Sequence, residues 1–171
     1  KPYIGSRDID LCFHAEEKGL EHSSLVQTIA VLQEKLRFKP LSFRLLKEIQ
    51  TETEEEIPEG KIIPLPFIFP MYVDLIVDII PPNFKKVVGF NPIDEPLLRF
   101  VFEQKQYTEV KEFEKKLLLP TPELMVAMKI NSLPNRDKEH KRIKDLCDLF
   151  ALLWYSSPAV NIEKSKEFVP E

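Results

Sequence analysis

Two aspartates near the start of the chain stand in a pattern suited to metal binding. Asp8 and Asp10 are separated by one apolar residue in an expected strand that follows a tight Gly5-Ser6 turn. Residues two apart on a strand point to the same face, with side chains roughly 7 Å apart. Two such carboxylates repel each other without a cation between them, and Mg²⁺ prefers oxygen ligands. The pair therefore indicates a metal site, with a solvated strand end as the alternative.

A second pair of aspartates interrupts the apolar segment 71–80. Apart from Asp74 and Asp78, which share one strand face, this segment is β-branched and apolar on both faces. That is the pattern of an interior strand. A buried unpaired carboxylate is costly, so each should be paired, protonated or metal-bound. One of the two is expected to be the third carboxylate that a two-metal phosphoryl-transfer site needs.

A small sheet must hold these residues, and the first two thirds of the chain predict its elements. Apolar spacing predicts a helix that begins after an N-cap at Ser23 or Ser24 and ends before Pro40. The acidic run 52–59 is expected at the tip of a hairpin. Further strands are expected at residues 41–50, 61–69, 71–80 and 97–107. The second of these should be an edge or irregular strand, because two prolines interrupt it.

Helical spacing dominates the last third of the chain. Thr121 is expected to cap a helix that starts with Pro122 and runs to about residue 133. After a polar turn, a second helix carries apolar residues at helical spacing: Ile143, Leu146, Phe150 and Leu153. The predicted fold class is α+β, a small mixed β-sheet with one early helix and a C-terminal helical hairpin. Residues 1–110 are expected to form the catalytic core, and 111–171 a helical region packed on it.

Composition sets broad limits on the function. The 171 residues are 43% apolar and 30% charged, as in an ordinary folded protein, and the net charge of -4 argues against a general nucleic-acid coat. No apolar run reaches membrane-spanning length. Cys12 and Cys147 match no zinc spacing and are interpreted as buried free thiols of a cytoplasmic protein. The chain begins at Lys1 without methionine, so a native N-terminal segment is expected to be missing.

The motifs resemble a known family. The sequence GSRDIDL at 5–11 is similar to the metal-binding strand of the DNA polymerase β-like nucleotidyltransferase superfamily. The C-terminal motifs resemble the AbiEii/AbiGii toxin nucleotidyltransferases, in which an alanine–lysine helix precedes a polar turn and a Lys/Arg-Asp-x-x-Asp helix. The matching segments are LPTPEL at 119–124, AMKI at 127–130, NRDK at 135–138 and KDLCDLFALL at 144–153.

This resemblance implies a metal-dependent nucleotidyltransferase. Such an enzyme moves an NMP from an NTP to a hydroxyl of an RNA, a protein or a small molecule, with Mg²⁺ or Mn²⁺ as cofactor. The implied partners are the NTP, a tRNA or protein acceptor and a cognate antitoxin, without a membrane. The implied metal ligands are Asp8, Asp10 and Asp74, with Asp78 as the alternative third ligand.

Other residues are implied at the nucleotide. Lys129 is expected to be catalytic, because its ammonium group would contact the phosphates; a lysine extending from a half-buried helix is the alternative. The further nucleotide contacts implied are Ser6, Arg7, Asp145 and Asp148. The superfamily places a Gly-Gly or Gly-Ser turn well before the metal strand, whereas Gly5-Ser6 almost adjoins Asp8. Either that turn lies in the missing segment or the chain lacks it.

Several alternatives stay open at this stage. The basic residues between 136 and 144 either grip phosphates or form a solvated helix face. His14 is interpreted as a structural or surface histidine that could also line the site. A degenerate, non-catalytic binding module of a toxin–antitoxin pair is one rival function. A PD-(D/E)xK-type metal-dependent nuclease is another; it would use Glu103 and Lys105 on the strand expected at 97–107.

Overall fold

The chain divides into two compact units, Lys1–Pro96 and Leu97–Glu171. The structure is a computed structural model that describes residues 7–15, 19–111, 117–156 and 160–169. Each unit has its own sheet or helical layer, so each is described by itself. The boundary expected after residue 110 lies inside the second unit.

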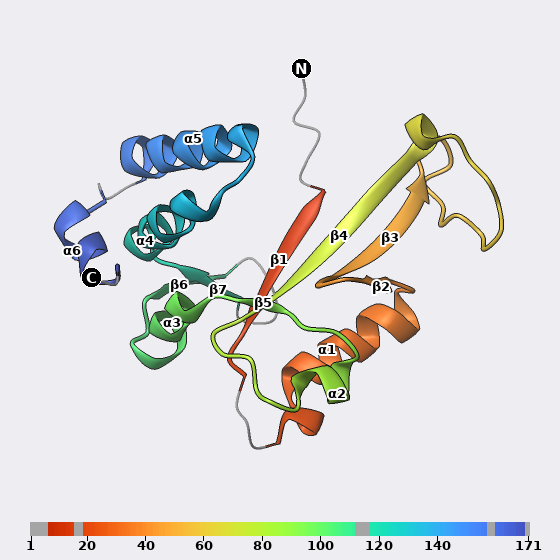
Figure 1. Cartoon of the computed structure of the whole chain (residues 1–171), viewed down its shortest axis with the longest axis horizontal. Coiled ribbons are helices and arrows are strands. Elements are labelled where there is room, and N and C mark those ends of the chain that lie inside the picture. Colours follow the sequence, from red (N-terminus) through yellow and green to blue (C-terminus); the bar gives the residue numbers. More distant parts are fainter. Residues whose placement is uncertain (1–6, 16–18, 112–116, 157–159, 170–171) are drawn as a thin grey trace. The chain divides into compact units, whose positions relative to one another are not determined.

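The described residues of the first unit form a mixed five-stranded sheet (Figure 1). Its strands are β1 (Asp8–Phe13), β2 (Lys39–Leu41), β3 (Arg44–Gln50), β4 (Ile68–Val77) and β5 (Ile93–Asp94). The order along the main path is β1-β4-β3-β2, and β5 also pairs with β4. Strand β4 is parallel to β1 and β5 and antiparallel to β3. The interior strand predicted at 71–80 is therefore confirmed over residues 71–77, and residues 78–80 lie beyond its end.

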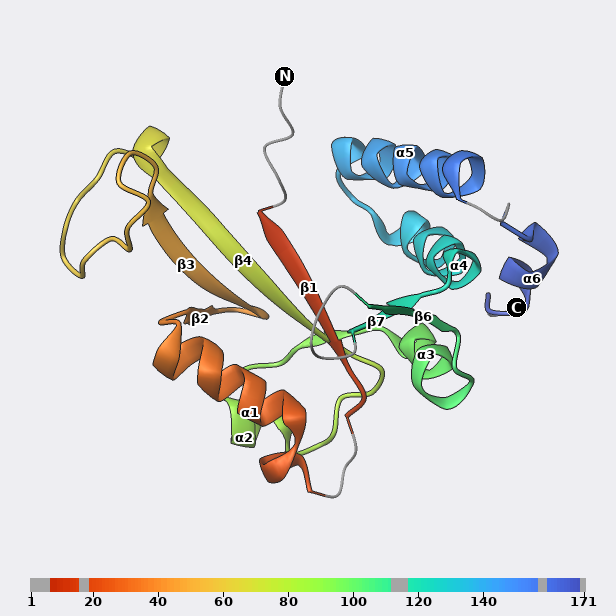
Figure 2. The same cartoon turned by 180° about the vertical axis from the view of Figure 1, so that it is seen from behind.

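One face of this sheet carries the hydrophobic core. Helix α1 (Ser24–Ala30), which continues as a π-helical turn over Val31–Lys35, and helix α2 (Phe84–Val88) lie close together on this side (Figures 1 and 2). The alternate β4 residues Val73, Leu75 and Val77 point into the core and are at most 2% exposed. Ser23 caps α1 as predicted, since its hydroxyl accepts from the Val26 N–H at 3.3 Å.

The hairpin between β3 and β4 departs from the prediction on one side. The acidic run lies in the long connection between these antiparallel strands, as expected. Residues 61–64 have no regular secondary structure, and Leu65–Phe67 form a 3-10 turn, so the strand predicted at 61–69 begins only at Ile68. Two prolines in this segment lack the N–H that a strand ladder requires.

The second unit combines a two-stranded antiparallel sheet with helices, within its described residues. The strands are β6 (Tyr107–Val110) and β7 (Leu117–Pro120), and the helices are α3 (Arg99–Glu103), α4 (Pro122–Ser132), α5 (Glu139–Tyr155) and α6 (Ile162–Lys166). Thr121 caps α4 as predicted, because its hydroxyl accepts from the Leu124 N–H at 3.4 Å. Helices α4 and α5 pack together as the expected hairpin. The predicted α+β fold class is confirmed.

The strand predicted at 97–107 is wrong. Pro96–Leu98 form a 3-10 turn, Arg99–Glu103 form helix α3, and strand β6 starts only at Tyr107. The buried residues Leu97, Leu98 and Val101 follow helical rather than alternating spacing. The nuclease alternative thereby loses the strand on which it places Glu103 and Lys105.

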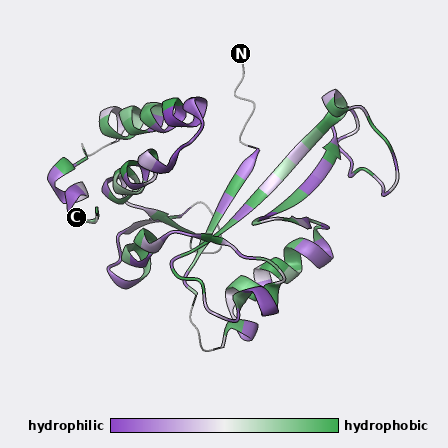
Figure 3. Ribbon diagram, viewed as in Figure 1, coloured by the Kyte–Doolittle hydropathy of each residue, from purple (hydrophilic) through white to green (hydrophobic). Residues whose placement is uncertain are grey.

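Helix α5 has apolar residues on two sides. Its half-buried or buried side carries Asp145, Asp148, Leu149 and Leu152. The stripe predicted from Ile143, Leu146, Phe150 and Leu153 is 41% to 59% exposed. Figure 3 shows the first half of α5 mostly hydrophilic and the second half mostly hydrophobic. Among the described residues, no helix has the length and apolar character needed to cross a membrane.

The prediction of buried thiols is also wrong. Cys12 and Cys147 are both free, as expected, but both are exposed. Cys12 alternates with Asp8 and Asp10, so it lies on the sheet face opposite the core. Cys147 lies on the outer side of α5.

Candidate functional site

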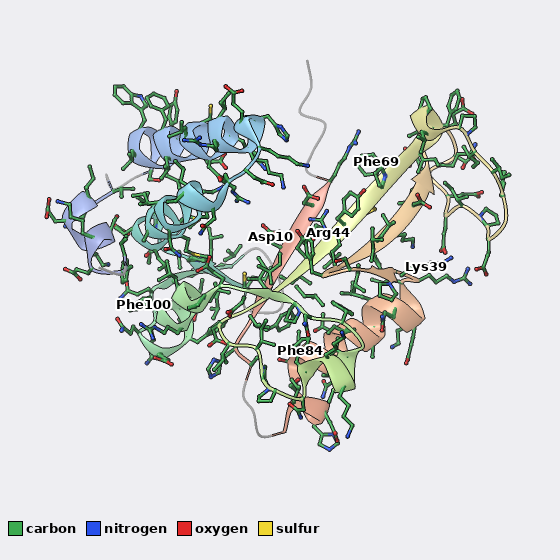
Figure 4. All side chains as sticks on the ribbon, viewed as in Figure 1. Asp10, Lys39, Arg44, Phe69, Phe84 and Phe100 are labelled. Carbon is green, nitrogen blue, oxygen red and sulfur yellow. The ribbon has the colours of Figure 1, made fainter. Side chains whose placement is uncertain are left out.

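The predicted carboxylates meet on the sheet face opposite the core. The strand register places Asp10 beside Asp74, and Asp74 beside Arg44, so these three residues form a row across β1, β4 and β3. Figure 4 shows Asp10 and Arg44 at this part of the sheet. Asp8 shares the face because it alternates with Asp10. We call this surface of Asp8, Asp10 and Asp74 the acidic face.

Arg44 holds the central carboxylate of this row. Its Nη2 donates to Asp74 Oδ2 at 2.7 Å, and its Nη1 lies 4.0 Å from Asp8 Oδ1. The guanidinium carbon is 4.7 Å from the centre of the Tyr72 ring and 4.9 Å from that of Phe43. Stacking on two rings together with an ion pair fixes the guanidinium orientation.

Asp74 is under opposing electrostatic influences. Burial raises its pKa, the charge and hydrogen bond of Arg44 lower it, and the nearby charges of Asp10 and Asp8 raise it again. The net result is a pKa above the usual value for aspartate. The side chain is 10% exposed. Burial, the largest of these influences, therefore outweighs the compensation that Arg44 provides.

One oxygen of Asp74 supports binding of a cation. Asp74 Oδ1 is buried and has no hydrogen-bond partner among the described residues. The same is true of Arg44 Nε. A divalent cation at Oδ1 would satisfy that oxygen, and the donor set of three carboxylates fits a hard cation such as Mg²⁺. In the described part of the chain, no group of three or more His, Cys, Asp or Glu side chains is arranged so that it could hold a metal ion. In its place, Arg44 supplies positive charge to Asp74 and Asp8.

The negative potential extends along β1 to Cys12. Although this residue as a whole is exposed, desolvation of its thiol, followed by the charges of Asp10 and Glu95, raises the pKa of Cys12 to about 11. A thiol with so high a pKa stays protonated near neutral pH and is a poor nucleophile. Cys12 is therefore poorly suited to thiol catalysis near neutral pH.

Asp78, the alternative third ligand, is engaged elsewhere. Its Oδ2 lies 2.5 Å from His14 Nδ1, and its Oδ1 accepts from the Ala15 N–H at 3.0 Å. Both oxygens of this buried carboxylate therefore have partners. The register places Asp74, and not Asp78, beside Asp10. The structure thus selects Asp74 as the carboxylate that adjoins the predicted pair.

Of the residues expected at the site just before β1, only Arg7 is among the described residues. Gly5 and Ser6 lie outside the described residues. Arg7 lies over the Phe69 ring at 5.6 Å, and strand alternation puts it on the opposite side from Asp8. A nucleotide contact from Arg7 stays a prediction without geometric support.

A second charged cluster joins α4 and α5. Lys129 Nζ donates to Asp145 Oδ1 and to Asp148 Oδ2, each at 2.7 Å, and Arg136 Nε donates to Asp145 Oδ2 at 2.7 Å. Asp145 is 2% exposed. Burial raises its pKa, but hydrogen bonds and charges from Lys129 and Arg136 outweigh burial and hold the pKa below its usual value.

Lys129 is firmly held within this cluster. Burial lowers its pKa, but the bonds to Asp145 and Asp148 outweigh burial and raise it. A cavity of about 450 Å³ opens beside the cluster. Its lining residues are Met125, Lys129, Asp148, Ala151, Leu152, Tyr155 and Ser156. The cluster and the acidic face belong to different units, so a joint site that includes Lys129 stays a prediction.

Two contacts were missed at the sequence level. Arg44 belongs to none of the motifs found in the sequence. Its pairing with Asp74 could not be predicted, because a long connection separates β3 from β4. The His14–Asp78 pair continues the alternation of two parallel strands, since His14 follows Asp10 and Cys12 at intervals of two residues and Asp78 follows Asp74 in the same way. That signal was present once β1 and β4 were assumed to be neighbours.

No family model, curated protein or solved structure matches the chain. The resemblance to the AbiEii/AbiGii nucleotidyltransferases accordingly rests on the motifs quoted above.

Proposed function

We propose that the chain is a metal-dependent nucleotidyltransferase that moves an NMP from an NTP to an acceptor hydroxyl. The observation that carries this proposal is the acidic face, where Asp10 adjoins Asp74 and a buried Asp74 oxygen has no hydrogen-bond partner among the residues that the structure describes. Three carboxylates on adjacent strands fit the cation-binding half of a phosphoryl-transfer site. The motif resemblance supports the same reaction.

Asp8, Asp10 and Asp74 would hold Mg²⁺ or Mn²⁺. When bound, the metal supplies neutralisation of phosphate charge and a lower pKa for the attacking hydroxyl. The chain itself contributes positioning: β1 and β4 hold the carboxylates on a rigid sheet, and the core on the opposite face keeps that sheet in place. Positioning and electrostatics account for most catalysis in phosphoryl transfer. Lys129 is proposed to contact the nucleotide phosphates, with Asp145 and Asp148 in supporting roles.

The acceptor is proposed to be a hydroxyl of an RNA, including tRNA, of a protein or of a small molecule. A labelling experiment separates these classes. The intact protein is incubated with each α-³²P-labelled NTP, Mg²⁺ and either total RNA or cell lysate. Asp10→Asn removes one proposed ligand charge, and Asp94→Asn serves as a matched control because Asp94 is an exposed aspartate of β5.

The expected result is label on one acceptor class with the wild type and with Asp94→Asn, and none with Asp10→Asn. Equal labelling by Asp10→Asn would refute the proposed metal site. Absence of label with every NTP, from folded wild-type protein, would favour the second candidate.

That second candidate is a non-catalytic binding module of a toxin–antitoxin pair. The observation that favours it is Arg44, because its guanidinium already compensates part of the negative charge of Asp74 and Asp8. A module of this kind has no need of a divalent cation. Calorimetric titration of the folded protein with Mn²⁺ discriminates between them, since binding supports the enzyme and its absence supports the module.

A further inference from the structure

Arg44 is held more tightly than a simple counter-charge requires. It combines a 2.7 Å bond to Asp74 with contacts to the rings of Tyr72 and Phe43, and its side chain is only 25% exposed. An exposed Arg–carboxylate pair would keep much of its rotamer freedom. Here the guanidinium plane is fixed before any ligand binds, and so is the carboxylate that it contacts.

We propose that Arg44 is a positioning residue for the cation site. It holds Asp74 by Oδ2, so that the buried Oδ1 remains as the ligand oxygen for a divalent cation shared with Asp10 and Asp8. This role rests on the proposed function: Arg44 would act on the bound cation through Asp74.

The order of residues across the sheet supports this assignment. Asp74 lies between Arg44 on β3 and Asp10 on β1, so its two neighbours in the row have opposite charges. The oxygen bonded to Arg44 is already satisfied, and the other has no partner among the described residues. Carboxylates that bind metals are commonly oriented by hydrogen bonds from a second layer of residues. Arg44 stands in that relation to Asp74.

The charge at this site allows two roles for Arg44, which differ in how its removal changes metal binding. Three ionised carboxylates and one guanidinium leave a net charge of about −2, which one divalent cation balances. If Arg44 were instead a stand-in for the cation, its removal would strengthen metal binding by relieving competition. If it positions Asp74, its removal weakens binding, because the carboxylate loses its fixed orientation. The two roles therefore predict changes of opposite sign.

The test is a titration of the intact chain with Mn²⁺, followed by calorimetry and by the electron paramagnetic resonance signal of free Mn²⁺. Arg44→Gln removes the charge, and Arg44→Lys keeps a charge but loses the planar fork. Arg37→Gln is the control for charge, since Arg37 is an arginine of the same unit with a side chain 74% exposed. Leu75→Ala is the control for stability, since it weakens the same sheet from the core side.

Arg44→Gln is expected to weaken Mn²⁺ binding roughly 10- to 100-fold, in the range found for residues that orient metal ligands. Arg44→Lys should fall between this variant and the wild type, while Arg37→Gln and Leu75→Ala bind as the wild type does. If Arg44→Gln proves unstable, Arg44→Lys alone decides: binding equal to that of the wild type overturns the positioning role.

Binding by Arg44→Gln that equals or exceeds that of the wild type overturns the inference while leaving the metal site standing. A folded wild type that binds no Mn²⁺ overturns the proposed function and this inference together. The two failures are distinguished by the wild-type titration alone.

Discussion

Replacing Asp145 by asparagine should strongly destabilise the second unit. Asp145 is 2% exposed, and each of its oxygens accepts a 2.7 Å bond from a cation, Lys129 on one side and Arg136 on the other. Removing one member of a buried ion pair typically costs about 3–5 kcal/mol, because charged partners lose their compensation. Asparagine keeps the shape and an acceptor oxygen, so we expect about 3 kcal/mol. That corresponds to roughly a hundredfold change in the unfolding equilibrium constant.

The matched comparison is Asp148→Asn. The Asp148 side chain is 38% exposed and accepts one bond from Lys129, which would still pair with Asp145. The expected loss is below about 1 kcal/mol, as for exposed ion pairs. Urea unfolding followed by far-ultraviolet circular dichroism reports on the helices of this unit, including α5. Equal losses for the two variants, or less than about 1 kcal/mol for Asp145→Asn, would refute the assignment of Asp145 as the centre of this cluster.

Three further changes test the fold. The lowered pKa of Asp145 contributes stability above about pH 4, and this contribution is lost as the pH falls through the lowered value. The raised pKa of Lys129 contributes stability below about pH 10, and this contribution is lost as the pH rises through the raised value. Urea midpoints of the second unit should therefore stay level around neutral pH and fall at both extremes; a steady change across neutral pH would contradict this. Ser23→Ala should cost about 1 kcal/mol by removing the α1 cap, measured by urea unfolding against Ser24→Ala, whose exposed side chain is not the cap. Leu75→Ala should cost about 2–5 kcal/mol because Leu75 is fully buried, and a loss near zero would show that the core collapses around the gap.

The strands that carry the aspartates could be predicted because alternation and burial agree there. The segment around Asp74 is too apolar for an edge strand, and β4 is indeed paired on both sides. The helix caps were equally predictable, since Ser23 and Thr121 act through local geometry that the sequence states directly.

Other features depended on tertiary contacts that sequence spacing does not encode. Residues 97–107 contain phenylalanine and valine, which favour strands, but burial of Leu97, Leu98 and Val101 selects a helical turn instead. On α5, the side that faces inward carries Asp145, which bonds to Lys129 of α4, whereas the apolar stripe predicted from spacing alone is exposed. The position of Arg44 beside Asp74 required the strand register across a long connection.

The three buried aspartates of the described residues differ in one respect that bears on function. Asp78 has partners on both oxygens, from His14 and the Ala15 N–H, and Asp145 likewise from Lys129 and Arg136. Asp74 alone among them keeps a buried oxygen without a partner. A buried acceptor without a hydrogen bond lowers the stability of the fold by about 1–3 kcal/mol. This oxygen beside Asp10 is therefore the observation that supports the proposed cation site.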